Sequence, residues 1–160
     1  MKKILVVILA LVMIFACSCG AKPAANEDSP LNDMAVTDIL AYLYDNTDLE
    51  LPELMGMELT TADQEYFLGT TDLEFTEALV SEPMIGSIPY SVCLVRFEDA
   101  KAAAEGAEKI AKSVNPRKWV CVEVPADKVI TTSSGNVAAL FMTEHSAALN
   151  EAFTKLAESK

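Results

Sequence analysis

The sequence predicts an α+β fold: a mainly antiparallel sheet of four to five strands, two long helices on one face of it, and a further helix at the N-terminal side of the domain. Segments rich in β-branched residues alternate with segments of helical period, which indicates a mixture of strands and helices. The clearest strands are joined by short connections, and short turns join antiparallel neighbours. Two successive β-β-α units would give this order, and a ferredoxin-like arrangement is the alternative.

The first residues, Met1–Gly20, have the pattern of a bacterial export signal. A short basic start precedes an unbroken apolar run over Ile4–Phe15. This run is shorter than the roughly 20 residues that a membrane-spanning helix needs, and it has the length of a signal-peptide core. The four residues that end at Cys17 are similar to a lipobox. We therefore predict a lipoprotein signal peptide over residues 1–16 and lipidation at Cys17, with Cys19 as the alternative.

Residues 17–30 are rich in alanine, proline and polar side chains, which is typical of a flexible tether. A flexible chain of this length holds its ends about 20 Å apart. Residues 31–160 then form a single domain. The expected location is the extracytoplasmic face of the cell membrane, with the membrane contacted through the N-terminal lipid.

The formal net charge is −12, and it is unevenly distributed. No lysine or arginine occurs between Lys22 and Arg96, whereas most of the 24 acidic residues precede Arg96. Nucleic acid is not an expected partner, because binding to phosphates requires clustered basic residues. The acidic half is either a solvated surface or a face for a basic partner or cations.

Helical spacing predicts a first helix that begins at Asn32 or Asp33 and ends near Tyr44. The segment 49–60 contains a proline and a glycine and has no clear period, so an ordered loop is expected there. A Thr-x-x-Gln capping box over 61–64 predicts a short helix that ends at Gly69, with Tyr66 and Phe67 turned inward.

A strand is expected over 77–81, and the segment 90–97 has the composition of a central strand. The strongest helix signal covers 98–114, where small apolar residues recur at helical spacing and Asn115-Pro116 ends the pattern. Further strands are expected over 119–124, 128–132 and 137–143, the last two joined by the hairpin signal Ser134-Gly135-Asn136. A final helix, capped by Thr143, extends to about Ser159.

Residues that could carry chemistry are few. The one histidine, His145, falls in the first turn of the last helix, and no motif supplies it with a nucleophile. The carboxylates Asp63, Glu65, Glu74 and Glu77 follow no spacing that would place two of them across a cleft. We therefore expect no catalytic, cofactor-binding or metal-binding residues, and no cofactor.

Cys93 and Cys121 fall in two predicted strands. In an exported protein a disulfide between them could persist, if the two strands pair with both side chains on one face. The alternative is two buried thiols that act as small apolar residues.

The link over 84–89, Met-Ile-Gly-Ser-Ile-Pro, is apolar and lies before the central strand. It is either an edge transition packed on the domain or an exposed hydrophobic contact for a partner.

Three stretches carry a resemblance to a known family: Tyr66-Phe67-Leu68-Gly69, the segment 78–97, and Ser134–Met142. With the alanine-rich helix between them, the chain resembles the small lipid-anchored proteins of clostridia-type bacteria designated domain of unknown function 4358. The resemblance covers about residues 31–157. It implies an exported α+β domain after a lipobox, and it implies no catalytic residues.

The expected function is that of a non-enzymatic interaction or accessory module at the cell envelope, with an envelope protein as its partner. A module that binds a small molecule or a cation is the alternative, and an envelope hydrolase that uses carboxylates is a further one. The sequence leaves the oligomeric state open.

Overall fold

The computed structural model describes residues 26–159. The predicted signal peptide, Cys17 and Cys19 lie outside these residues. The described helices and strands are η1 (Pro30–Asn32), α2 (Val36–Asp45), β1 (Leu54–Glu58), α3 (Gln64–Leu68), β2 (Glu77–Pro83), β3 (Ser91–Arg96), α4 (Ala100–Ser113), η2 (Ala126–Lys128), β4 (Val129–Ser134), β5 (Val137–Met142) and α5 (Ser146–Ala157).

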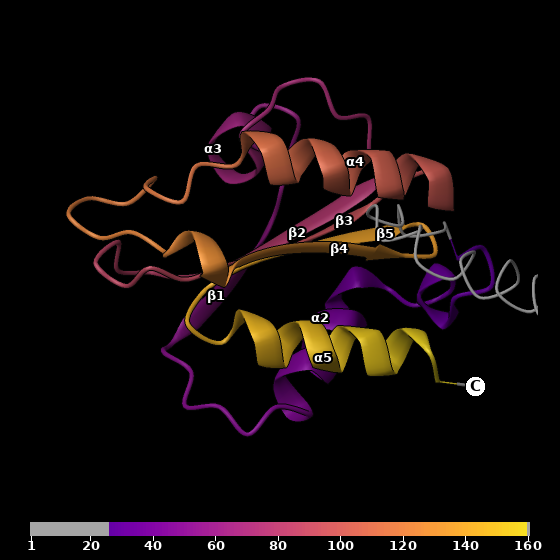
Figure 1. Cartoon of the computed structure of the whole chain (residues 1–160), viewed down its shortest axis with the longest axis horizontal. Coiled ribbons are helices and arrows are strands. Elements are labelled where there is room, and N and C mark those ends of the chain that lie inside the picture. The colour runs from indigo at the N-terminus through magenta and orange to yellow at the C-terminus, as the bar shows by residue number, and fades with distance from the viewer. Residues whose placement is uncertain (1–25, 160) are drawn as a thin grey trace, which may run out of the picture.

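The five strands form one antiparallel sheet in the order β1-β2-β3-β5-β4. The predicted α+β class, with helices packed against an antiparallel sheet and a helix at the N-terminal side, is confirmed (Figure 1). Strand β3 lies in the middle, as its composition predicts, and its first five residues are buried. The chain contains the units β2-β3-α4 and β4-β5-α5, which is not the β-α-β-β-α-β order of a ferredoxin-like fold.

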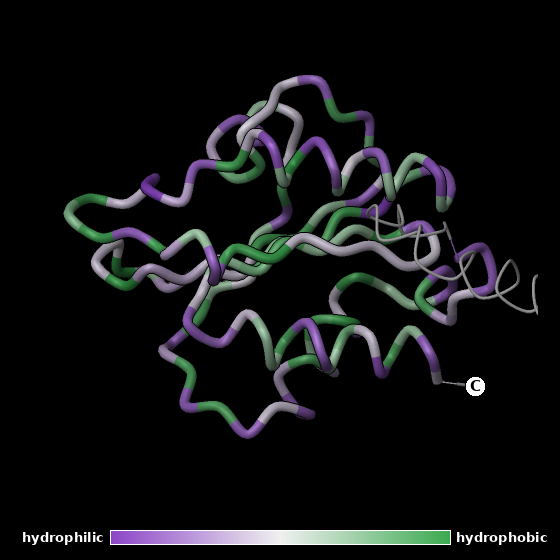
Figure 2. Tube along the Cα trace, in the orientation of Figure 1, coloured by the Kyte–Doolittle hydropathy of each residue, from purple (hydrophilic) through white to green (hydrophobic). Residues whose placement is uncertain are grey.

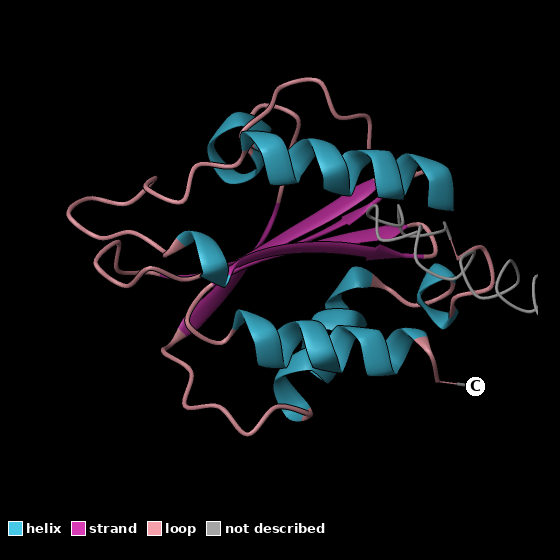
Figure 3. Ribbon diagram, in the orientation of Figure 1, coloured by secondary structure: helices cyan, strands magenta, loops and turns pink. Residues whose placement is uncertain are grey.

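The prediction that both long helices lie on one face is wrong. Helix α4 covers one face of the sheet, and α5 covers the opposite face together with α2 (Figures 1 and 3). Successive side chains of β3 alternate between the two cores: Cys93 and Val95 face α4, and Val92 and Leu94 face α5. Because β3 and β5 are apolar on both faces, each face needs a helix to cover it.

Strand β1 replaces the loop expected over 49–60. It pairs with β2 from Leu54 opposite Pro83 to Glu58 opposite Leu79. The segment has no strand pattern of its own, because Gly56 interrupts the apolar residues, and the long-range ladder with β2 supplies its conformation.

Helix α3 begins at Gln64, and the predicted capping box is absent from it. Its N-cap residue, Asp63, makes no side-chain bond to the helix, and the Gln64 side chain instead donates to the Thr61 carbonyl at 3.2 Å. Gly69 ends the helix as predicted, in the left-handed conformation with φ 76°. Phe67 is half-buried, but Tyr66 is exposed rather than turned inward.

The strand predicted over 119–124 is also absent. Residues 114–125 form a loop between α4 and η2, which the Val124 N–H closes by donating to the Pro116 carbonyl at 3.0 Å. Cys121 in this loop has φ 66°, a conformation that no strand contains. The alternating valines of the loop do not mark one buried face, because Val120 is exposed while Val124 is buried.

Arg96 fixes the start of the described chain to one end of the sheet. Its Nη1 donates to the carbonyls of Leu31 and Asn32, each at 3.1 Å, and its Nη2 donates to the Met34 carbonyl. The Asn136 N–H donates to Asn32 Oδ1 at 2.8 Å. Residues 31–34 are therefore held against the β4–β5 hairpin, and we call this end of the sheet the hairpin end.

The other end, which we call the loop end, is formed by Leu54, Pro83, Ser91, Val129 and Met142, which terminate or begin the five strands. The loops 84–90 and 114–125 lie there, side by side on the left of Figure 1, opposite residues 26–34. Figure 2 shows hydrophobic residues in both loops as well as in the sheet.

Candidate functional site

Every large hydrophobic side chain that is exposed within residues 26–159 belongs to a segment at the loop end. They are Met55, Tyr66, Met84, Ile85, Ile88 and Val120, and we call this set the apolar end. The most exposed are Val120 at 79 %, Met84 at 73 % and Ile85 at 64 %. Single exposed hydrophobics are common on protein surfaces, but six at one end of a sheet make this end the candidate site of the domain.

The loop 84–90 holds its apolar side chains outward because of how it is anchored. Pro83 ends β2, and the buried Tyr90 ring fixes the return of the chain to β3. Between them the Ile88 N–H donates to the Ile85 carbonyl at 3.4 Å, which closes a turn. The link is therefore exposed rather than packed on the domain, and its contact with a partner stays a prediction.

Lys118 lies directly beneath the apolar end. Its side chain is only 3 % exposed, and its ammonium group forms an ion pair with Glu82 at the end of β2. The same Nζ donates to Ser91 Oγ at 3.2 Å. The positive charge is therefore both neutralised and hydrogen-bonded, as a buried charge requires.

Three aromatic rings surround this ammonium group. Its Nζ lies 4.6 Å from the ring centre of Phe67, 4.9 Å from that of Tyr66 and 5.2 Å from that of Trp119. These distances allow cation–π attraction, which is stronger where water is excluded. Lys118 thus joins α3, the end of β2 and the loop 114–125, and it lies against the ring of the exposed Tyr66.

Sequence reasoning missed this cluster. Lys118 and Glu82 are separated by 36 residues, and each falls in a segment without a distinctive pattern. The one available signal is a lysine beside the single tryptophan of the chain, which does not identify its partner.

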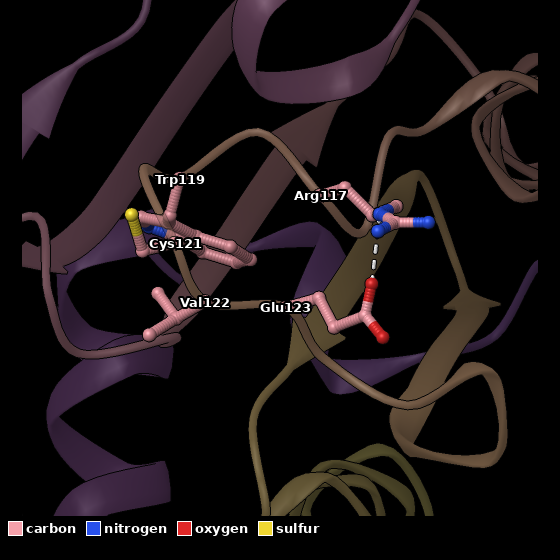
Figure 4. Close-up of a pocket in the computed structure, with 5 residues that line it drawn as sticks. All are labelled: Arg117, Trp119, Cys121, Val122 and Glu123. Atoms are coloured by element: carbon pink, nitrogen blue, oxygen red, sulfur yellow. Dashed lines mark ion pairs between the residues drawn. The ribbon is translucent and has the colours of Figure 1, made fainter.

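The loop 114–125 also encloses a cavity of about 390 Å³, lined by Arg117, Trp119, Cys121, Val122 and Glu123. Figure 4 shows Trp119, Cys121 and Val122 close together, with the Arg117–Glu123 ion pair to one side of them. The ion pair measures 2.8 Å, and both side chains are mostly exposed, so it contributes little stability. Because one loop supplies every lining residue, this cavity is a hollow in the loop 114–125 rather than a cleft between elements.

The two cysteines of the domain are in different environments. Cys93 is fully buried in β3, and its Sγ lies 3.7 Å from Ser91 Oγ. Burial raises the pKa of the Cys93 thiol to about 11. Cys121 is exposed in the loop, and both thiols are free in the structure. The strand that would have brought Cys121 beside β3 is not formed, so the disulfide stays a prediction without that support.

Three of the remaining candidate residues, His145, Asp63 and Glu77, have structural contacts. The His145 side chain is half-buried at the start of α5, where the His145 N–H donates to Thr143 Oγ1 at 3.3 Å. Asp63 accepts a bond from Thr60 at 2.6 Å, and Glu77 pairs with Arg96 at 3.1 Å. Within residues 26–159, no group of three or more histidine, cysteine or acidic side chains is arranged to hold a metal ion.

No family model, curated protein or solved structure matches this chain. The resemblance to the clostridia-type lipoproteins therefore stays an expectation that rests on the residues quoted for it. Among the helices of the described part of the chain, none has the length and hydrophobicity that crossing a membrane requires.

Proposed function

We propose that the protein is a lipid-anchored, non-enzymatic interaction module on the extracytoplasmic face of the cell membrane, and that it binds a partner protein through the apolar end. The observation that carries this proposal is the gathering of Met55, Tyr66, Met84, Ile85, Ile88 and Val120 at the loop end of the sheet. A patch of this kind on a folded domain is typical of a protein contact.

The position of the patch supports the proposal. Residues 31–34 are bonded to the hairpin end, so a tether over 17–30 would join the domain at the end opposite the apolar end. A tether that spans about 20 Å would leave the apolar end free to face a partner away from the lipid.

The rigidity of the patch also supports a binding role. The Lys118–Glu82 ion pair and the three aromatic rings hold the loop 114–125 in one position. A preorganised surface loses little conformational entropy on binding. Methionine side chains such as Met55 and Met84 can in turn adapt to the shape of a partner.

The experiment is quantitative crosslinking of the full-length protein in intact cells. A variant with Met84→Ser, Ile85→Ser and Val120→Ser should lose the partner that the wild-type protein enriches, because it removes apolar surface without changing charge. The control is Lys101→Ser with Glu105→Ser, a charge-neutral change of an exposed pair on α4. This control should retain the partner. Equal enrichment by the triple variant and the wild type would contradict the proposal.

A further inference from the structure

Strand β1 presents an unpaired backbone edge beside the apolar end. The Leu59 N–H donates to the Ala78 carbonyl at 2.9 Å, which continues the β1–β2 ladder. Backbone groups alternate in direction along an antiparallel strand, so those of Met55 and Met57 face β2. Those of Leu54, Gly56 and Glu58 therefore face away from the sheet. Across the described residues, no backbone partner bonds to them.

The two edges of the sheet differ in how they are protected. At the β4 edge, α4 and α5 both pack against the strand, and all six of its residues are half-buried. At the β1 edge, Met55, Gly56 and Glu58 are exposed. Proteins protect open edges with lysine, proline, a bulge or a covering element. Strand β1 contains no lysine or proline, and its register with β2 is continuous.

Gly56 is not explained by packing within the domain. A Cβ atom added there would have Leu79 Cδ1, at 3.9 Å, as its one near neighbour, and the backbone does not require positive φ. Glycine inside a strand weakens it, and where no bulge or bend requires it, close approach of a ligand or another backbone is a common reason for it. An added strand beside β1 would supply that backbone.

The charge beside this edge indicates the chemistry of the occupant. Glu58 at the end of β1 is exposed, and so are Asp48, Glu50 and Glu53 before the strand and Glu65 after it. In the region from 26 to 159, the ion pairs involve other carboxylates and leave these five without a cation. A segment that carries lysine or arginine would provide that charge.

We propose that β1 binds an extended basic segment of the partner as a sixth strand of the sheet. This inference rests on the proposed function, because it assumes a partner protein at this end of the domain. The side chains of Met55 and Met57 lie on the α4 face of β1, and Glu58 lies on the opposite face. Side chains of the added strand that lie beside the two methionines are therefore apolar, and those on the other face are basic. The segment alternates valine or isoleucine with lysine or arginine, and strand addition of this kind is an established mode of peptide binding.

The test uses the full-length protein in nanodiscs of zwitterionic lipid and a short fluorescent peptide that alternates lysine and valine. Binding should slow hydrogen exchange at the Gly56 and Glu58 amides by at least about tenfold, because these N–H groups become hydrogen-bonded. The Met55 and Met57 amides already face β2 and should change less. A peptide that alternates glutamate and valine should not bind.

A matched pair of variants gives a second readout. Gly56→Pro removes the outward N–H without breaking the ladder to β2. It should lower the affinity for the lysine–valine peptide at least about tenfold. Gly56→Thr keeps the N–H and favours a strand, so it should bind the peptide as well as the wild type does or better. Circular dichroism of both variants verifies that the domain is folded.

Three results would overturn strand addition: no binding of the lysine–valine peptide at about 1 mM, no protection of Gly56 and Glu58 when it is bound, or equal binding by a folded Gly56→Pro variant. These results are separable from failure of the proposed function. If the peptide fails while the triple serine variant still loses the partner, the apolar end remains the contact and strand addition is wrong. If the peptide protects β1 while the serine variant keeps the partner, β1 does bind a strand, and the apolar end is not the contact with the partner.

Discussion

Lys118 and Glu82 form an ion pair that is almost completely enclosed beneath the exposed hydrophobic side chains of the loop end, with side chains 3 % and 11 % exposed. Ser91 and three aromatic rings complete the surroundings of the ammonium group. A buried pair of this kind joins three segments that are distant in sequence: α3, the end of β2 and the loop 114–125.

Removing one member of the Lys118–Glu82 pair should destabilise the folded domain. Lys118→Met should lower the free energy of unfolding by about 3–5 kcal/mol, because it leaves the Glu82 carboxylate buried without a counter-charge. The double variant Lys118→Met with Glu82→Leu should be more stable than the single one, since no buried charge remains. Urea unfolding measures the free energy of unfolding of the wild type, the single variant and the double variant.

The neighbouring Arg117 is the matched control for this prediction. Its ion pair with Glu123 is mostly exposed, so Arg117→Met should change the free energy of unfolding by less than about 1 kcal/mol. If Lys118→Met and Arg117→Met have equal effects, the Lys118 pair does not organise the loop.

Arg96 should hold the N-terminal segment to the sheet. Arg96→Met removes donors to the carbonyls of Leu31, Asn32 and Met34, and it leaves those acceptors without their charged partner. Hydrogen bonds to a charged group contribute about 1.5–3 kcal/mol each. We expect faster hydrogen exchange over 31–36 and a loss of at least about 2 kcal/mol in unfolding free energy. Unchanged exchange in this segment would show that the contacts of Arg96 are dispensable.

A methyl group added at Gly106 of α4 should destabilise the domain. Glycine to alanine normally stabilises a helix by about 0.5–1 kcal/mol. Here the added Cβ would lie 2.3 Å from Phe97 Cζ, so Gly106→Ala should destabilise the domain by about 1–3 kcal/mol. Adding Phe97→Leu should relieve part of the Gly106→Ala clash. Thermal unfolding of the single and double variants decides this, and a stabilised Gly106→Ala would contradict the packing described for α4.

The two cysteines should differ in reactivity. Iodoacetamide at pH 8 should modify the exposed Cys121 rapidly, whereas Cys93 should react only after unfolding, because it is buried and its pKa is raised to about 11. Peptide mapping by mass spectrometry without reductant measures both. A Cys93–Cys121 linked peptide would instead establish the disulfide.

The Cys93 thiol should make the free energy of unfolding decrease at alkaline pH. The pKa of Cys93 is higher in the folded protein than its ordinary value of 9.0, so the unfolded chain loses this proton first. The stabilisation is complete below about pH 9 and is lost as the pH rises towards about 11. The free energy of unfolding should fall over this range, and less steeply in Cys93→Ala. Parallel curves for the two proteins would exclude a contribution from Cys93.

The parts of the fold with a local signal could be predicted from the sequence. Strand β3, the hairpin at Gly135-Asn136 and helix α4 each have a run, a turn or a period that is complete within one segment. The placement of the helices on two faces could also have been inferred, since β3 and β5 are apolar on both faces.

The candidate site depends on relationships that no single segment contains. Ladder bonds to β2 form β1, and the conformation of the loop 114–125 depends on Lys118 reaching Glu82. The apolar link over 84–89 was visible in the sequence, but its exposure was one of two interpretations. Only the folded chain brings Met84 and Ile85 to the same end of the sheet as Val120.

Site-specific photocrosslinking in intact cells tests the central claim most directly. A photoreactive benzoylphenylalanine replaces Ile85 at the apolar end in one protein and Lys101 on the exposed surface of α4 in another. The account predicts a discrete adduct with one partner protein from position 85, lost on adding Val120→Ser, and no such adduct from position 101. The same adducts from both positions, or none from position 85, would contradict it.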